Sequence, residues 1–281
     1  MKVPNSSQTH QKQTLSSGAV RHSNRRDNIT NTIQVIPVEG LPLIQSGDNL
    51  GKMIVEAAEK QNTPIQPGDV VVVTHVVVSK SEGTVVDLNT VKPSQRAVEI
   101  ANQTSKDPAL VEVILQETKD IVRIGQNSII TETNSGVICA NAGVDRSNVS
   151  GDHNVVPLPK NPNASAVSIR AEIKRLSGAE VAVIVSDTHG RPFRMGEINV
   201  AIGTAGFKPI RDRRGEKDLF GYVLRIKQTA IADELASAAE LVIGQASEGI
   251  PAAIVRGYNY QPTEDTAVTV LMRPKEKDIF R

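Results

Sequence analysis

The run Val70-Val71-Val72-Val73-Thr74-His75-Val76-Val77-Val78 decides the fold class. Valine is β-branched and favours strands, and this run is too apolar for either face of a strand to meet water. It therefore predicts a central strand in a sheet that is covered on both faces. Residues 181–186, with the sequence VAVIVS, predict a second strand of the same kind.

Helical patterns alternate with these strands. Apolar residues recur at helical spacing in several segments, and Ser94 and Pro108 suit helix starts. Helices are expected near residues 48–61, directly after Ser94, directly after Pro108, over 165–177 up to Gly178, and over about 222–239. The fold class is therefore α+β (mixed α/β), and the Pro/Asn-rich residues 152–164 are the expected sub-domain boundary.

Residues 1–32 differ from the rest of the chain. They hold five basic residues and one acid, Asp27, and their apolar residues are isolated. Such a segment cannot bury enough surface to offset its ordering entropy, so we expect a disordered polar tail. A targeting peptide is the alternative, but the segment lacks a secretory apolar core and an amphipathic stripe.

The composition excludes several classes of protein. The formal net charge is +1, which argues against a general nucleic-acid or membrane-surface binder. No apolar run reaches the roughly 18 residues that span a bilayer, so we expect a cytoplasmic protein with no membrane partner. Cys139 is the single cysteine, which rules out an internal disulfide and a cysteine-rich zinc site.

No common nucleotide-binding motif is present. Residues 47–53 approach a P-loop, but the glycine spacing is one residue short and Met53 replaces the magnesium-binding hydroxyl. We interpret them as an ordinary helix start.

Four segments gather polar residues beside apolar ones. Lys80, at the end of the valine run, suits a phosphate ligand and a solvated turn equally well. Asp145 and Asn148 could reach a metal and a nucleotide, although an Asp/Asn turn explains them better. The loop around Gln245, framed by Gly244 and Gly249, could wrap a nucleotide, although an ordinary helix-terminal loop is favoured.

The fourth segment carries the strongest functional signal. Asp187 and Thr188 follow a buried strand directly, and their oxygens are hard ligands that suit magnesium or manganese. Arg191 follows in the same predicted loop, with further arginines after it, which indicates an anionic substrate. A capping Asp-Thr with solvent-facing arginines is the alternative. His189 is expected to be structural, and Cys139 a packed apolar residue.

Five stretches in this order resemble the coenzyme F420-0:L-glutamate ligase family over residues 33–281, which we expect to form one ligase-like domain. They are residues 40–44 (GLPLI), 78–83 (VSKSEG), 140–148 (ANAGVDRSN), 186–194 (SDTHGRPFR) and 244–251 (GQASEGIP). The resemblance implies an F420 ligase-like fold that forms an intertwined homodimer. It also implies a GTP-dependent enzyme that joins L-glutamate to a deazaflavin carboxylate through an acyl phosphate.

The resemblance assigns roles residue by residue. Asp145, Asp187 and Arg191 would be catalytic. The metal ligands, for two Mg2+ or Mn2+ ions, would be Asp145, Asp187, Thr188 and Gln245, with K+ as a further cation. GTP would contact Leu41, Pro42, Leu43, Ile44, His75, Val76, Lys80, Asn148, Ile243, Gly244, Gln245, Ala246, Ser247, Glu248, Gly249 and Ile250.

Two departures from the family pattern keep alternatives open. They lie at His75-Val76, where relatives often carry Gln-Lys, and at residues 133–136, which lack an expected basic residue. One alternative is the same ligase chemistry on a different carboxylate acceptor. The other is a GTP-binding protein without catalysis.

Overall fold

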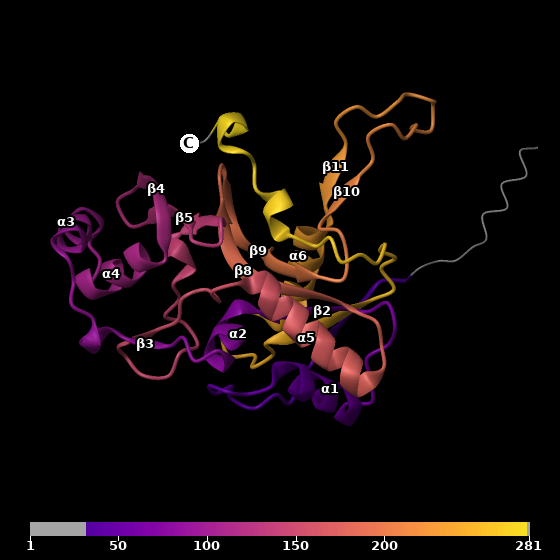
Figure 1. Cartoon of the computed structure of the whole chain (residues 1–281), viewed down its shortest axis with the longest axis horizontal. Coiled ribbons are helices and arrows are strands. Elements are labelled where there is room, and N and C mark those ends of the chain that lie inside the picture. The colour runs from indigo at the N-terminus through magenta and orange to yellow at the C-terminus, as the bar shows by residue number, and fades with distance from the viewer. Residues whose placement is uncertain (1–31, 280–281) are drawn as a thin grey trace, which may run out of the picture. The chain divides into compact units, whose positions relative to one another are not determined.

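The two predicted apolar strands lie side by side at the centre of a five-stranded sheet. The computed structural model describes residues 32–279 (Figure 1), so the predicted tail lies outside the described residues except for Thr32. The sheet has the order β1-β12-β2-β8-β9. Its strands are β1 (Gln34–Pro37), β12 (Ala252–Arg256), β2 (Val70–Thr74), β8 (Ala182–Arg191) and β9 (Arg194–Ala205). β2 and β8 are parallel and the other pairs antiparallel, which confirms the mixed α/β class.

The valine run does not form one strand, which corrects the prediction. The strand ends at Thr74, and residues His75–Ser81 form the helix α2. Thr74 has extended backbone angles at the N-cap position, but its side chain makes no capping hydrogen bond. Val77 and Val78 are buried from the helix instead, because burial against the core outweighs the strand preference of valine.

The second apolar strand is longer than predicted. β8 continues through residues 187–191, which the sequence placed in a loop, because each of them pairs with β9. The pairing includes Asp187 with Val200 and Thr188 with Asn199. The polar residues of this segment therefore stand on a rigid strand of the central sheet.

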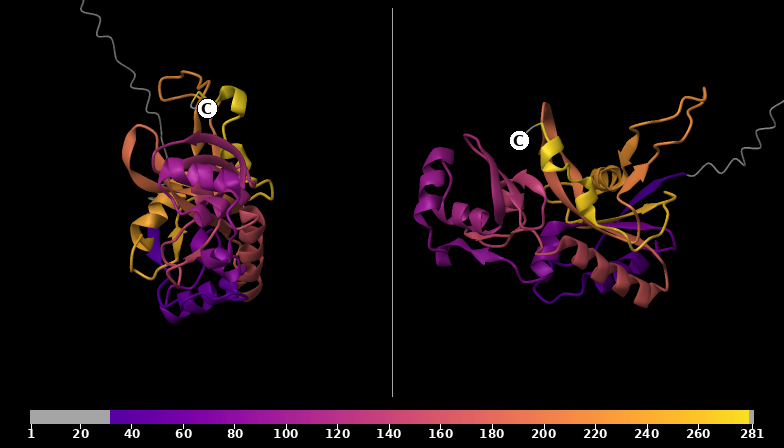
Figure 2. Two further views of the ribbon diagram at one scale, coloured as in Figure 1. Left: turned by 90° about the vertical axis from the view of Figure 1, so that its left-hand side faces the viewer. Right: turned by 45° about the horizontal axis from the view of Figure 1, so that its top comes forward.

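Helices cover both faces of the central sheet. Val71, Val73, Val183 and Val185 pack with α1 (Leu50–Lys60) and α5 (Pro162–Ser177) on one face. The alternate positions Val70, Val72, Ala182 and Ile184 pack with α6 (Ile231–Ile243) on the other face. Figure 2 shows this layering from two further directions. Because side chains alternate between the two faces of a strand, the same two strands supply both cores.

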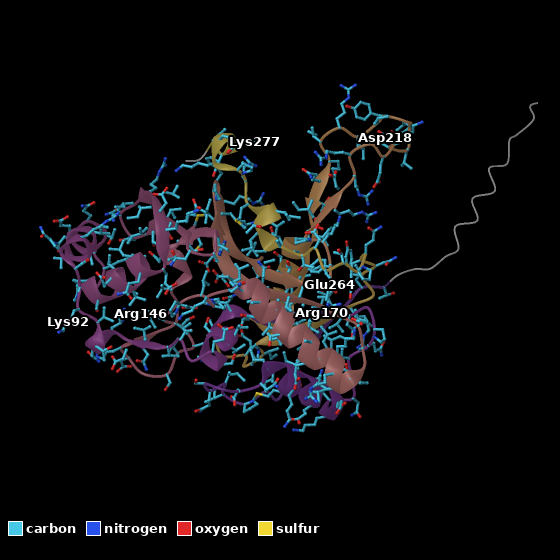
Figure 3. All side chains as sticks on the ribbon, in the orientation of Figure 1. Lys92, Arg146, Arg170, Asp218, Glu264 and Lys277 are labelled. Atoms are coloured by element: carbon cyan, nitrogen blue, oxygen red, sulfur yellow. The ribbon has the colours of Figure 1, made fainter. Side chains whose placement is uncertain are left out.

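Local capping explains where four of the described helices begin. Side chains of Asn49, Ser94, Asp107 and Asn161 accept hydrogen bonds at the starts of α1, α3 (Gln95–Thr104), α4 (Pro108–Gln116) and α5. The helix after Ser94, the one after Pro108 and the stop at Gly178 are therefore confirmed. Arg170 of α5 pairs with Glu264 at 3.0 Å (Figure 3), which ties that helix to the segment after β12.

The fifth predicted helix is wrong at its start. It begins at Ile231, while Gln228–Ala230 forms strand β11, paired with β10 (Ile210–Asp212). Residues 222–227 of the prediction lie on this hairpin, where Ile226 is 90% exposed. Most of the stability of a helix comes from packing its apolar face against a core, and Ile226 has no such packing, so the helix does not extend back over this segment.

A second group of elements builds its own core beside the central sheet. The antiparallel sheet β4 (Thr118–Ile124), β5 (Ile129–Thr133) and β6 (Ile138–Ala140) packs against α3 and α4. β3 (Val86–Asp87) pairs with β7 (Asn154–Val155). The segment 152–164 contains β7 and leads into α5, and its role as a sub-domain boundary stays a prediction. None of the helices between residues 32 and 279 is long and apolar enough to cross a bilayer.

Candidate active site

The predicted site residues line one large cavity at the ends of β2 and β8. Thr74 pairs with Ser186, so the next residues of the two strands, His75 and Asp187, emerge side by side. The cavity has a volume of about 1160 Å³. Every residue predicted to bind nucleotide or metal lines it except Ser247, which belongs to the same loop as Gln245. Segments far apart in the sequence therefore converge as the sequence predicted.

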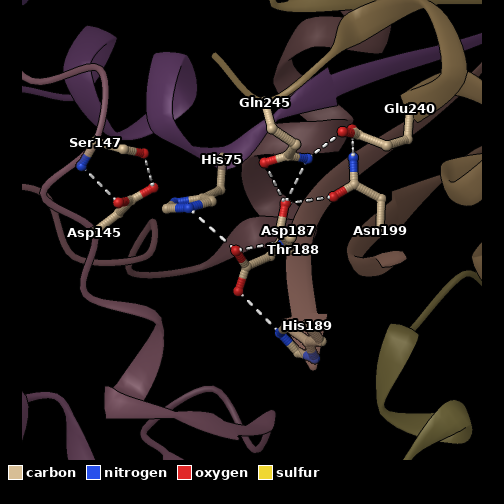
Figure 4. Close-up of polar contacts among 9 residues, drawn as sticks. All are labelled: His75, Asp145, Ser147, Asp187, Thr188, His189, Asn199, Glu240 and Gln245. Carbon is tan, nitrogen blue, oxygen red and sulfur yellow. Dashed lines mark hydrogen bonds and ion pairs between the residues drawn. The ribbon is translucent and has the colours of Figure 1, made fainter. Parts of the chain in front are cut away.

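Asp187 lies at the centre of a hydrogen-bonded cluster (Figure 4). Its Oδ1 accepts the backbone N–H of Thr188 at 2.7 Å and lies 3.2 Å from Nε2 of His75. Its Oδ2 lies 2.9 Å from Nε2 of His189. The carboxylate is 7% exposed. Burial alone would raise the pKa of Asp187, but the charge of His75 and the hydrogen bonds of His189 and His75 outweigh burial and hold this pKa well below its ordinary value.

Two histidines contact the carboxylate of Asp187. His75, predicted to contact nucleotide, turns its Nε2 to Asp187 and is 3% exposed. His189 is structural in the sense that it orients Asp187, because residues two apart on a strand share one face, and the predicted loop at 187–191 concealed this relation. Both imidazoles therefore fix the direction of the central carboxylate.

A second cluster surrounds Thr188. Its hydroxyl donates to Oδ1 of Asn199 at 2.8 Å and accepts Nε2 of Gln245 at 3.0 Å. The amides of Asn199 and Gln245 both donate to the carboxylate of Glu240. Burial raises the pKa of Glu240, and the hydrogen bond from Gln245 opposes that shift only in part. Glu240 thus holds Gln245, from the loop after α6, against Thr188 of β8.

Sequence reasoning missed Asn199 and Glu240. Each carried a signal, since Asn199 interrupts the apolar alternation of residues 198–202 and Glu240 interrupts the apolar run 238–243. A polar residue inside an apolar pattern indicates either a buried partner or a site.

Asp145 approaches the cavity from the segment after β6. Its carboxylate accepts the backbone N–H of Ser147 at 2.7 Å and the Ser147 hydroxyl at 2.9 Å, so the predicted Asp/Asn turn is present. The residue nevertheless lines the same cavity as Asp187. Lys80 extends from α2, not from a strand end, and donates to the carbonyl of Asn148. Burial lowers the pKa of Lys80, and the negative charge of Asp145 opposes this shift.

Cys139 lies beside the central carboxylate as a packed side chain. Its sulfur and the ligand atoms of Asp187 and His189 all lie within 4.8 Å of one another. Burial raises the pKa of the Cys139 thiol, and the charge of Asp187 raises it further. The thiol is therefore neutral, which agrees with a packing role and argues against a nucleophile.

The predicted arginine cluster divides in the structure. Arg191 lines the cavity, and its Nη2 donates to the carbonyl of Met195 at 2.8 Å. Its Nε is buried and has no hydrogen-bond partner among the described residues. Arg194 does not line the cavity, and Arg214 pairs with Asp212 on the β10–β11 hairpin.

The donor set suits a hard divalent cation. The two carboxylates of Asp145 and Asp187, the hydroxyl of Thr188 and the amide oxygen of Gln245 are all oxygen ligands on one cavity. Nδ1 of His75 is buried without a hydrogen-bond partner among residues 32–279. A buried polar atom is normally paired, so this side of the cavity still has one hydrogen-bonding atom available for a ligand. The residues present therefore fit magnesium or manganese.

Comparison with known proteins points to one family. Residues 40–257 match the family described as F420-0:Gamma-glutamyl ligase. The chain is 48% identical over 250 residues to the coenzyme F420:L-glutamate ligase of Methanothermobacter thermautotrophicus, covering 89% of this chain and 99% of the relative. It is 48% identical over 251 residues to the protein of that name from Methanocaldococcus jannaschii, covering 89% and 97%. The Methanosarcina mazei protein of the same name is 39% identical over 248 residues, covering 88% and 95%.

Proposed function

The chain belongs to the F420-0:gamma-glutamyl ligase family, and from this premise we propose that it is a GTP-dependent enzyme that adds L-glutamate to the deazaflavin coenzyme precursor F420-0. The observation that carries the proposal is the convergence of five separate family stretches on one cavity around an ionised Asp187. We also propose that the reaction takes place in the cytoplasm.

Ligation needs an activated carboxyl group, because an amine does not displace carboxylate oxygen unaided. In the proposed reaction, a carboxylate oxygen of the acceptor attacks the γ-phosphorus of GTP and GDP leaves with the bridging oxygen. The α-amine of glutamate then attacks the acyl carbon, loses a proton, and displaces inorganic phosphate. Further cycles would attach γ-linked glutamates by the same steps.

Four side chains would hold the divalent cations, Mg2+ or Mn2+, namely Asp145, Asp187, Thr188 and Gln245. Bound there, the ions would neutralise phosphate charge and stabilise the transferring phosphoryl group. The protein's own contribution is to keep Asp187 ionised and to align these oxygens, with His75 and His189 on Asp187 and Glu240 on Gln245. We place K+ as a further cation near the same phosphates.

The remaining cavity residues suit the triphosphate of GTP and the carboxylate groups of the acceptor and of glutamate. Lys80, partly buried and held by Asn148, offers an ammonium group to phosphate. The loop 243–250 presents backbone N–H groups between two glycines with positive φ, Gly244 and Gly249. Arg191 lines the cavity, and its guanidinium group suits a carboxylate or phosphate.

We also propose that the enzyme works as a homodimer. The β10–β11 hairpin carries Asp218 near its tip (Figure 3), and Leu219, Phe220 and Ile226 beside it are at least 90% exposed. Apolar side chains on one hairpin are costly in water and suit burial in a second copy of the chain. Light scattering is expected to give the mass of two chains, and a monomer at assay concentration would contradict this part of the proposal.

The direct test is a mass-resolved assay with GTP, Mn2+, L-glutamate and F420-0. Phosphate release is expected only when both F420-0 and glutamate are present, together with a mass gain of one glutamyl unit. Phosphate release with a different carboxylate, and none with F420-0, would favour another acceptor. Metal-dependent GTP binding with no turnover at all would instead indicate a non-catalytic GTP-binding protein.

A further inference from the structure

One wall of the cavity holds none of the residues assigned to nucleotide or metal. It consists of the β4–β5–β6 sheet and the segment 271–273 near the C-terminus. We propose that this wall binds the planar deazaflavin of the acceptor, with arginines at its edge for the acceptor's phosphodiester. The inference rests on the proposed function and adds a binding site for the second substrate.

The sheet has two different faces. Ile129 is fully buried and belongs to the core with α3 and α4, whereas its neighbour Ile130 faces the cavity and is only half-buried. Val122 of β4 and Ile138 of β6 also line the cavity and are half-buried. The cavity side of this small sheet is therefore an apolar surface that the described chain leaves partly open.

An irregularity in β4 adds a charge to that surface. The register shifts between Ile121 and Arg123, so Val122 is an extra residue in the ladder. Such a bulge re-aims side chains, and here both consecutive residues, Val122 and Arg123, line the cavity. In a regular strand one of the two would point to the opposite face.

The C-terminal segment lies next to this surface. Lys275 pairs with Asp120 of β4 at 3.3 Å, directly after the cavity residues Leu271, Met272 and Arg273. Half-buried Met272 offers a flexible thioether that suits contact with an aromatic ring.

The charges on the wall favour an anion. Arg123 and Arg273 are exposed on it, Arg191 adjoins it, and Asp278 contributes one carboxylate. An apolar surface bordered by guanidinium groups suits a planar aromatic ligand that carries phosphate or carboxylate. A nucleotide would also satisfy this chemistry, so the experiment has to separate the two ligands.

The wall also reaches the reacting centre. β6 carries Ile138 and Ala140 on the face that Ile130 shares, while Cys139 between them points to the opposite face, where its sulfur lies within 4.8 Å of ligand atoms of Asp187 and His189. The same strand leads into the segment that carries Asp145. An acceptor lying on the sheet could therefore extend its carboxylate toward the two acidic residues.

The test measures F420-0 binding through deazaflavin fluorescence, without GTP, on Arg123→Gln, Arg273→Gln and the double variant. We expect affinity to fall about tenfold for each change, as for the loss of a charge-assisted hydrogen bond. GTP affinity, measured by calorimetry with Mn2+, is expected to stay within twofold. Arg96→Gln, the same change on the exposed surface of α3 outside this cavity, serves as the control and is expected to bind normally.

The apolar part has its own variant, Ile130→Asn, which is expected to weaken F420-0 binding by a similar factor with an unchanged melting temperature. If the wild type glutamylates F420-0 but both arginine variants bind it normally, the wall assignment is overturned and the proposed function stands. If the arginine variants lose GTP affinity as much as F420-0 affinity, the wall assignment is overturned, because these residues then contact the nucleotide. If the wild type neither binds nor glutamylates F420-0, both proposals are wrong.

Discussion

Replacing Asp187 by asparagine is expected to abolish glutamate transfer, lowering turnover about a thousandfold or more. The change removes the buried negative charge that the divalent cations would need. It also places an amide NH2 group opposite an imidazole N–H, because His75 and His189 each direct Nε2 at one carboxylate oxygen. One of these contacts must then break or change tautomer, so the remaining oxygen also loses its orientation.

The measurement is the mass-resolved assay, with circular dichroism and thermal melting to show that the variant is folded. Asp152→Asn provides the matched control, because Asp152 is an exposed aspartate outside both the cavity and the β10–β11 hairpin. It is expected to keep nearly full activity. Activity of Asp187→Asn near that of the control would remove Asp187 from the reaction.

Replacing Arg256 by methionine is expected to lower the free energy of unfolding by about 3–5 kcal/mol. Arg256 of β12 donates from Nε and Nη2 to the two oxygens of Asp69, at 2.9 and 2.8 Å. Asp69 is 1% exposed, so loss of the guanidinium leaves a buried carboxylate without its counter-charge. Arg256 also donates to the carbonyl of Pro64, a contact that methionine cannot replace.

Urea unfolding measures this loss, and Arg175→Met supplies the control. Arg175 bonds Glu172 on the surface of α5, and such exposed pairs contribute less than about 1 kcal/mol. The double variant Asp69→Asn, Arg256→Met is expected to recover part of the loss, because no buried charge remains. If Arg256→Met and Arg175→Met lower the free energy of unfolding equally, the buried pair of Arg256 with Asp69 contributes no more than an exposed ion pair.

The apolar pattern predicted most of the central fold. Residues 70–73 and 182–185 are apolar on both faces, and only a covered sheet accommodates such strands. Ser94, Pro108 and Gly178 marked helix ends because their chemistry at those positions is local. The wrong boundaries at 75–78 and 222–230 both depend on tertiary contacts, since valine and isoleucine suit either a helix or a strand once a core is supplied.

The sequence predicted which segments form the candidate site, but not the hydrogen bonds that join their side chains. The resemblance to a family identified Asp145, Asp187, Thr188 and Gln245, and they line one cavity. The roles of Asn199 and Glu240 depend on the register of β8 with β9 and on the docking of α6, which no short-range pattern encodes. The β4–β6 wall was missed because its residues look like an ordinary strand pattern.

The parallel pairing of β2 with β8 also determines when the site can form. Parallel strands need a crossover, and here the crossover contains α3, α4 and the whole β4–β6 sheet. Contacts between such distant segments close large loops and therefore come late in folding. Gln245 joins later still in the order of synthesis, from beyond α6. A ribosome-bound chain that stops short of Gln245 lacks one oxygen of the centre, so the capacity to bind substrate reports that the central sheet and α6 are already in place.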